Sequence, residues 1–112
     1  MIDLVLDYIT MENNLFFNIL YKDKKLGEVC ITNDSDCYVV MIDAYKDFRK
    51  KHYDDRTEAL FDKIFYFVDH YDFIDRFNKP VLLLEDDYVA SKYAVDHDLK
   101  RVPRYCGFYL YN

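Results

Sequence analysis

Aromatic side chains and carboxylates are interspersed between residues 62 and 75, and this mixture suits recognition of a basic protein. Tyrosine is enriched at the energetic centres of protein interfaces, and nearby carboxylates attract cationic partners. We therefore predict a partner-binding patch here, joined by two carboxylates just upstream. Its members are Asp54, Asp55, Asp62, Tyr66, Asp69, Tyr71, Asp72 and Asp75. The alternative, which carries equal weight, is a solvated helix face whose tyrosines border the core.

A second group of chemistry-bearing residues is basic and lies between residues 46 and 56. Side-chain cations can hold phosphate groups where a loop lacks glycines. The residues that would do so are Arg49, Lys50, Lys51, His52 and Arg56. We favour the alternative, a solvated loop whose cations are balanced by neighbouring carboxylates such as Asp43 and Asp47.

The cysteines and histidines show no spacing typical of a metal site or a disulfide framework. Cys30, Cys37 and Cys106 form an odd set without a Cys-x-x-Cys pair, and the three histidines are scattered. We expect reduced, mostly buried thiols and no bound metal.

Length and composition predict one folded domain spanning residues 1–112. The chain is 52% hydrophobic and 19% aromatic, which supplies ample apolar area for a core. A formal net charge of -6 opposes nonspecific attraction to nucleic acid or to an anionic membrane. The two glycines, Gly27 and Gly107, stand alone, which excludes a glycine-rich phosphate loop. No apolar run approaches the roughly 20 residues that span a bilayer, and the N-terminus lacks the basic start of a signal peptide, so we expect a cytoplasmic protein.

The first half of the chain has the period of β-structure. Alternating or continuous apolar runs predict four strands at Ile2–Ile9, Leu15–Tyr21, 26–31 and 37–42. Residues 22–25 supply a hairpin turn, and Gly27 marks a bulge. The fourth run is apolar on both faces, which predicts a central strand buried on two sides.

The second half predicts two helices around a short strand. An apolar stripe from Leu60 to Tyr71 predicts a long helix, with Asp55 and Glu58 at the spacing of a capping box. A continuous apolar run predicts a buried strand at residues 81–84. Residue 86 or 87 is the expected cap of a shorter helix that ends near residues 97–98. Residues 101–111 are expected to supply a last strand or hairpin. The predicted fold is α+β (α/β), with a mixed central sheet, two main helices and the order ββββαβαβ.

This order resembles the fold of the GNAT superfamily of N-acetyltransferases over roughly residues 15–111. The resemblance is carried by residues 39–44 leading to 59–64, by 81–85 followed by 90–93, and by 99–102. It implies acetyl-CoA as cofactor and a general-acid tyrosine, for which Tyr93 is the candidate. The family's glycine-rich pyrophosphate loop aligns with residues 52–57, which contain no glycine and place Asp54 and Asp55 where a polyanion would sit. The family's early helix pair is also missing.

We predict a catalytically inactive acetyltransferase-like domain, without a cofactor, that acts as an acidic binding module or inhibitor on a basic protein surface. The small size and acidic composition favour a viral or mobile-element origin, such as a phage. Two alternatives stay open. One is a divergent N-acetyltransferase using acetyl-CoA, with Tyr93 as general acid and the basic group on the phosphates. The other is a structural or assembly subunit, homodimeric through an edge strand or the tyrosine-rich C-terminus.

Overall fold

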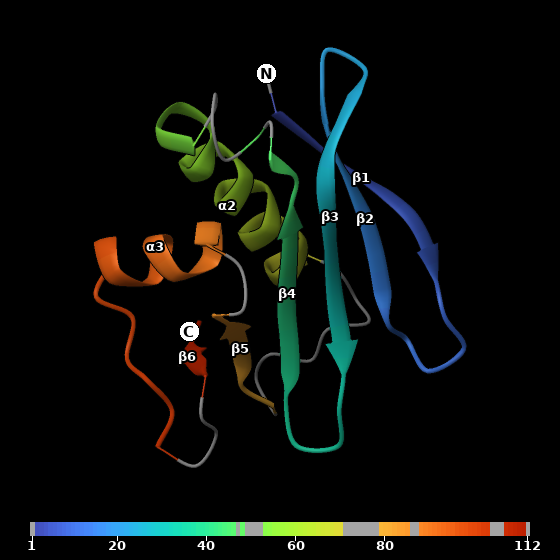
Figure 1. The fold of residues 1–112 in the computed structure, drawn as a ribbon. Helices are drawn as coiled ribbons and strands as arrows, with labels where there is room; N and C mark the ends of the chain where they lie inside the picture. The colour runs from blue at the N-terminus through green and yellow to red at the C-terminus, as the bar shows by residue number, and fades with distance from the viewer. Residues whose placement is uncertain are drawn as a thin grey trace.

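The computed structural model contains a six-stranded mixed sheet and two main helices (Figure 1). It describes residues 2–46, 48, 53–70, 79–85, 88–103 and 107–111, without the side chains of residues 53–55 and 88. The strands are β1 (Ile2–Ile9), β2 (Leu15–Tyr21), β3 (Lys24–Asn33), β4 (Tyr38–Ala44), β5 (Val81–Leu84) and β6 (Phe108–Leu110), and the helices are α2 (Tyr53–His70) and α3 (Tyr88–Asp96). The α+β class and the order ββββαβαβ confirm the prediction from sequence.

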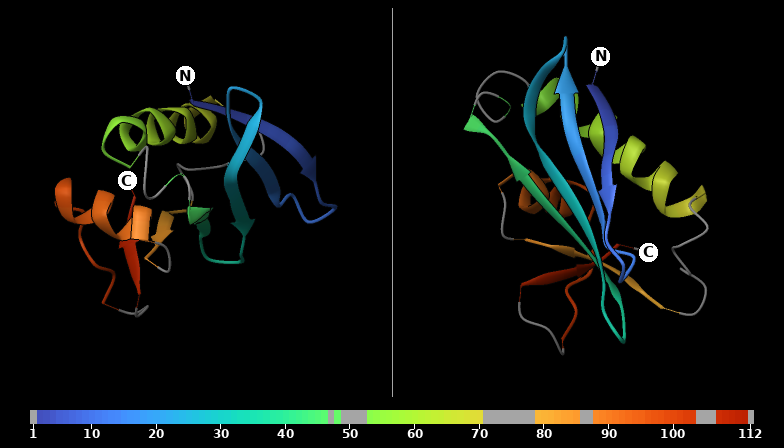
Figure 2. Two further views of the ribbon diagram at one scale, coloured as in Figure 1. Left: turned by 45° about the horizontal axis from the view of Figure 1, so that its top comes forward. Right: turned by 90° about the vertical axis from the view of Figure 1, so that its right-hand side faces the viewer.

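The strands lie side by side in the order in which the chain makes them, from β1 to β6. β1 to β4 pair antiparallel as a meander, β4 and β5 are parallel, and β5 and β6 are antiparallel. Arg101 bridges Tyr109 on the outer side of β6, so the predicted C-terminal hairpin is present. The sheet twists strongly from one edge to the other (Figure 2).

The hairpin between β2 and β3 follows the local chemistry of its residues. Lys22 and Asp23 both have positive φ, 50° and 63°, as a two-residue turn matched to strand twist requires. Beyond the turn, Leu20 pairs with Lys25 whereas Ile19 pairs with Gly27, so one extra residue lies in β3. The predicted bulge at Gly27 is confirmed.

Both helices pack on the same face of the sheet, and the core lies between them and the strands. Their buried side chains are Leu60, Phe61, Ile64 and Val68 on α2 and Val89, Ala90, Tyr93 and Ala94 on α3. They meet alternate strand residues such as Leu15, Phe17 and Val40, and Phe48 is fully buried with them. On the other face of the sheet no helix is found in the described part of the chain, only a small buried cluster of Cys37, Val39 and Leu82.

The parallel pair of β4 and β5 is short. Pairing covers three positions, from Tyr38 with Val81 to Val40 with Leu83, after which β4 continues to Ala44 paired with β3 alone. The prediction that this strand is buried on both faces is confirmed for residues 37–40 and is wrong at Met41, whose side chain is 36% exposed. The second face is covered only beside β5 and β6, where Leu82 and Phe108 provide contacts.

The start of α2 differs from the predicted capping box. The helix begins at Tyr53, so Asp54 and Asp55 lie in its first turn and Asp55 is not the cap. Carboxylates in a first turn still interact favourably with the positive end of the helix.

The end of α3 is marked by a residue in the left-handed conformation. Asp98, just after the helix, has φ 51°, and the amide of Leu99 donates to the carbonyl of Ala94. The predicted caps at residues 86 and 87 lie outside the described residues.

Candidate functional site

The outer face of α2 gathers carboxylates around one exposed tyrosine. Glu58, Asp62 and Tyr66 follow at four-residue spacing and Asp69 lies three residues further, so all four share one side of the helix. All are exposed, and Tyr66 is 61% exposed. We call these four residues the acidic stripe. The apolar side chains of α2 occupy the opposite side, which leaves the stripe clear of the core.

Three of the residues predicted for partner binding lie in the acidic stripe, and one stripe residue was missed. Asp62, Tyr66 and Asp69 come together as predicted from their spacing. Asp54 and Asp55 belong to the first turn of the same helix, but their side chains lie outside the described part of the structure, as do Tyr71, Asp72 and Asp75 entirely. Glu58 was assigned to capping alone, although its four-residue spacing to Asp62 places it in the stripe.

Aromatic and charged neighbours hold the stripe in place. The ring of His70 stacks on Tyr66 with centroids 4.3 Å apart, and its Nδ1 lies 2.9 Å from the Tyr66 carbonyl oxygen. Glu58 Oε1 lies 2.5 Å from His97 Nε2, which ties α2 to the segment after α3. The lysine inside this stretch, Lys63, turns instead toward Asp3 on β1, with 4.0 Å between Nζ and Oδ1. The stripe thus carries three carboxylates, one of which pairs with His97, beside the ring of Tyr66.

The candidate general acid, Tyr93, is buried between the two helices and is only 7% exposed. Its ring stacks on Phe61 of α2 at 3.7 Å between centroids and on His97 at 4.1 Å. Burial raises the pKa of the Tyr93 phenol, and the charges of Glu58 and Asp62 raise it further. A phenol in this setting is protonated at neutral pH and is a weaker acid than a free one.

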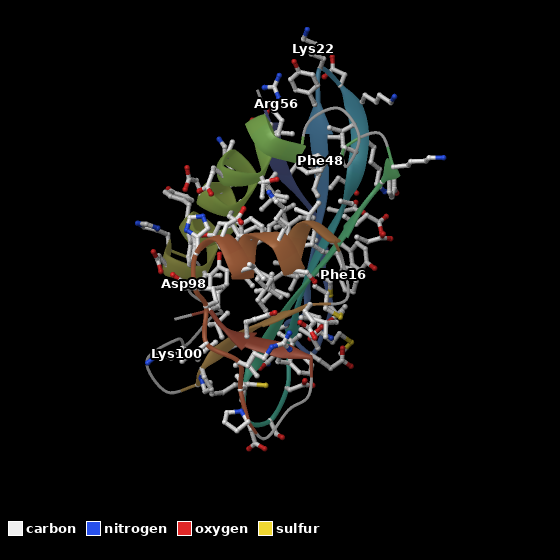
Figure 3. All side chains as sticks on the ribbon, turned by 60° about the vertical axis from the view of Figure 1, so that its left-hand side comes forward. Phe16, Lys22, Phe48, Arg56, Asp98 and Lys100 are labelled. Atoms are coloured by element: carbon white, nitrogen blue, oxygen red, sulfur yellow. The ribbon has the colours of Figure 1, made fainter. Side chains whose placement is uncertain are left out.

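The basic group predicted from sequence is represented in the structure by Arg56 alone. Its Nη2 donates to the Tyr21 hydroxyl at 2.6 Å, and its guanidinium lies 4.1 Å from the centre of that ring. Figure 3 shows Arg56 near the β2–β3 turn that carries Lys22, on the same side of the molecule as Phe48. Residues 49–52 lie outside the described residues. The bond to Tyr21 uses one of the five N–H donors of the guanidinium.

The cysteines in the described residues are sheltered thiols. Cys37 is buried, and burial raises its pKa, with Asp34 and Asp36 adding to the effect. Cys30 is half-buried, its pKa is also raised by burial, and its Sγ lies 3.5 Å from Thr32 Oγ1. Both fit the prediction of unreactive thiols, and Cys106 lies outside the described residues.

The described residues offer neither a metal site nor a membrane span. No three His, Cys, Asp or Glu side chains among them are grouped so as to hold an ion. Within the same ranges, neither helix combines the length and apolarity needed to cross a bilayer. The C-terminal tyrosines suggested as a dimer contact, Tyr109 and Tyr111, are buried within this chain at 5% and 4% exposure.

Comparison of the chain with protein-family models, with curated proteins and with solved structures found no match.

Proposed function

We propose that this protein is a binding module that docks its acidic stripe against a basic protein surface and carries out no acetyl transfer. The observation that supports this proposal is the grouping of Glu58, Asp62 and Asp69 around the exposed ring of Tyr66. An exposed aromatic ring among carboxylates combines apolar contact with attraction for lysine or arginine. A partner whose own basic site is covered in this way would be inhibited.

The placement of Tyr93 and Arg56 supports a role outside catalysis. Tyr93 stacks between Phe61 and His97, and its raised pKa weakens it as a proton donor. Arg56 is already hydrogen-bonded to Tyr21. Both side chains have a structural reason for their positions.

The test is capture of a partner with matched charge variants. A purified, immobilised sample is used to capture a stoichiometric partner, and affinity is then measured with that partner in purified form. We expect Asp62→Asn with Asp69→Asn to weaken binding about tenfold and Tyr66→Ala to weaken it by a similar factor. The control variant, Glu12→Gln with Asp23→Asn, removes the same charge from two exposed turns and should bind as the parent does. Equal loss in both double variants, or the absence of any stoichiometric partner, would overturn the proposal.

A second candidate function, acetyl-CoA-dependent N-acetyl transfer, is favoured by the end of the β4–β5 ladder. After three paired positions β4 extends past its parallel neighbour, and a hollow of about 440 Å³ lined by Met41, Asp43 and Leu84 lies there. In that case Tyr93 would be the general acid, and Arg49, Lys50, Lys51, His52 and Arg56 would hold the phosphates. Isothermal titration with acetyl-CoA separates the two functions, because micromolar binding fits the enzyme and no binding at millimolar concentration fits the binding module.

A further inference from the structure

The face of the sheet turned away from α2 and α3 carries more apolar surface than a solvated face needs. We call it the open face. Alternation along the strands places Val5 and Tyr8 of β1, Phe16 of β2, Cys30 of β3 and Met41 of β4 on it. Val5 and Tyr8 are 45% and 52% exposed. Figure 3 shows Phe16 across the sheet from both helices.

Four of these side chains form a continuous row across the first four strands. Tyr8 pairs with Phe16, Phe16 with Cys30, and Cys30 with Met41. The rings of Tyr8 and Phe16 stack with centroids 4.5 Å apart and an interplanar angle of 10°. The row is a straight apolar track at right angles to the strands, about as wide as one layer of side chains.

The track leads into a hollow beside the end of β4. The hollow has a volume of about 440 Å³, and its apolar lining includes Phe16, Met41 and Leu84. Glu28 and Asp43 lie on its acidic side, and they pair across β3 and β4. Lys25 neutralises Glu28, with 2.6 Å between Nζ and Oε1, whereas Asp43 forms no ion pair within the described part of the chain. The hollow is therefore lined by apolar side chains, with the carboxylate of Asp43 at one side.

A helix is the element that ordinarily covers such a face. The track crosses the antiparallel strands β1 to β4, and in the described residues both helices pack on the opposite face of these strands. A partner helix that lies along the track would bury its own apolar stripe there. The polar side chains that border this stripe would then lie near the hollow. A second copy of this chain is disfavoured, because its open face offers Asp43 another carboxylate rather than a cation.

We propose that the open face docks an amphipathic helix of a partner protein, with the apolar stripe of that helix on the Tyr8–Met41 track and a lysine or arginine beside Asp43. This surface lies across the sheet from the acidic stripe and does not depend on the proposed function. The charge of Asp43 selects a basic flank, and the row of Phe16, Cys30 and Met41 selects leucine-like side chains.

The experiment uses methionine methyl groups as reporters on the whole protein. The probe is a helical peptide of about four turns built from leucine and lysine, and a leucine–glutamate peptide of equal length is the charge control. In ¹³C-methyl NMR, Met41 reports on the track, while Met11, 99% exposed in the β1–β2 turn, is an internal control. We expect the leucine–lysine peptide to shift the Met41 signal and to leave Met11 unchanged.

Variants separate this surface from the acidic stripe. We expect Phe16→Ala to weaken peptide binding at Met41 about tenfold and Asp43→Asn about fivefold, whereas Asp62→Asn should leave it unchanged. Phe16 lies outside the buried core, so its variant should fold. Equal binding of the glutamate peptide would overturn the proposal, and so would Met41 shifts that depend on protein concentration without peptide. Peptide binding that leaves the Met41 signal unchanged and is lost in Asp62→Asn would also overturn it, while leaving the acidic stripe as the binding surface.

Discussion

Replacing Gly27 with alanine should destabilise the sheet, because the backbone of β4 occupies the space a side chain would need. A Cβ atom on Gly27 would lie 2.4 Å from the carbonyl oxygen of Asp43 and 3.0 Å from the Cα of Ala44. Both neighbours are backbone atoms in a paired strand, so neither can move as a flexible side chain would. Since Cβ atoms essentially never approach closer than 3.0 Å, the strands must separate by 3.0 − 2.4 = about 0.6 Å.

The size of the effect follows from what that separation disturbs. Overpacking a tight site costs about 1–3 kcal/mol. The amide of Tyr45 donates to the Leu26 carbonyl at 2.7 Å beside the same position, and weakening this bond adds about 1 kcal/mol. We therefore expect Gly27→Ala to lower the free energy of unfolding by about 2–4 kcal/mol, which lowers Tm by about 10 °C in a domain of this size.

Urea denaturation followed by circular dichroism measures this loss, and the other glycine provides the control. A Cβ atom on Gly107 would lie 3.9 Å from its nearest neighbour, Glu85 Cγ, so Gly107→Ala makes only an ordinary van der Waals contact and suffers mainly from its φ of 86°. That backbone strain costs about 1–2 kcal/mol. The reasoning about close approach is refuted if Gly27→Ala is no more destabilising than Gly107→Ala.

Three further variants test the packing around the two helices. Tyr93→Phe keeps the ring stacks, so the free energy of unfolding at pH 7 should change by less than about 0.5 kcal/mol. Because the folded-state pKa of Tyr93 is raised, the parent should lose stability as the pH rises above about 10, and the variant should lose less. Thermal melts across this pH range measure the difference. Arg56→Lys should lower the unfolding free energy by about 1 kcal/mol, since the planar contact with Tyr21 is lost although the charge is kept, and an unchanged urea midpoint would contradict this. His97→Gln removes both the partly exposed pair with Glu58 and the stack on Tyr93 and should lower the unfolding free energy by about 1 kcal/mol in the same assay; a larger loss would mean that these two contacts anchor α3.

The order and class of the elements could be predicted because the apolar period changes sharply along the chain. The alternation in Leu15–Tyr21 and the helical spacing from Leu60 to Val68 are both local signals, and the structure follows each of them. The cover on each face of the sheet could not be predicted in this way. Met41 has an apolar type but faces a side without a helix in the described residues, and nothing near it in sequence reports that.

The candidate site was predictable where it depends on one helix and was missed where it depends on tertiary contacts. Asp62, Tyr66 and Asp69 share a helix face by spacing alone. The contact of Arg56 with Tyr21 joins residues 35 positions apart, and the stacking of Tyr93 on Phe61 joins two helices. Pairings of this kind follow from strand order and helix packing, which a one-dimensional pattern does not contain.

The agreement between strand order and chain order also bears on how the protein is made. The first four strands each pair with the one just synthesised, so loop closure is short and the meander can assemble while the rest of the chain is still emerging from the ribosome. Tyr38 and Val81 join segments about 40 residues apart, and their parallel ladder must wait for α2. The seam between β4 and β5 accordingly closes after the meander has formed.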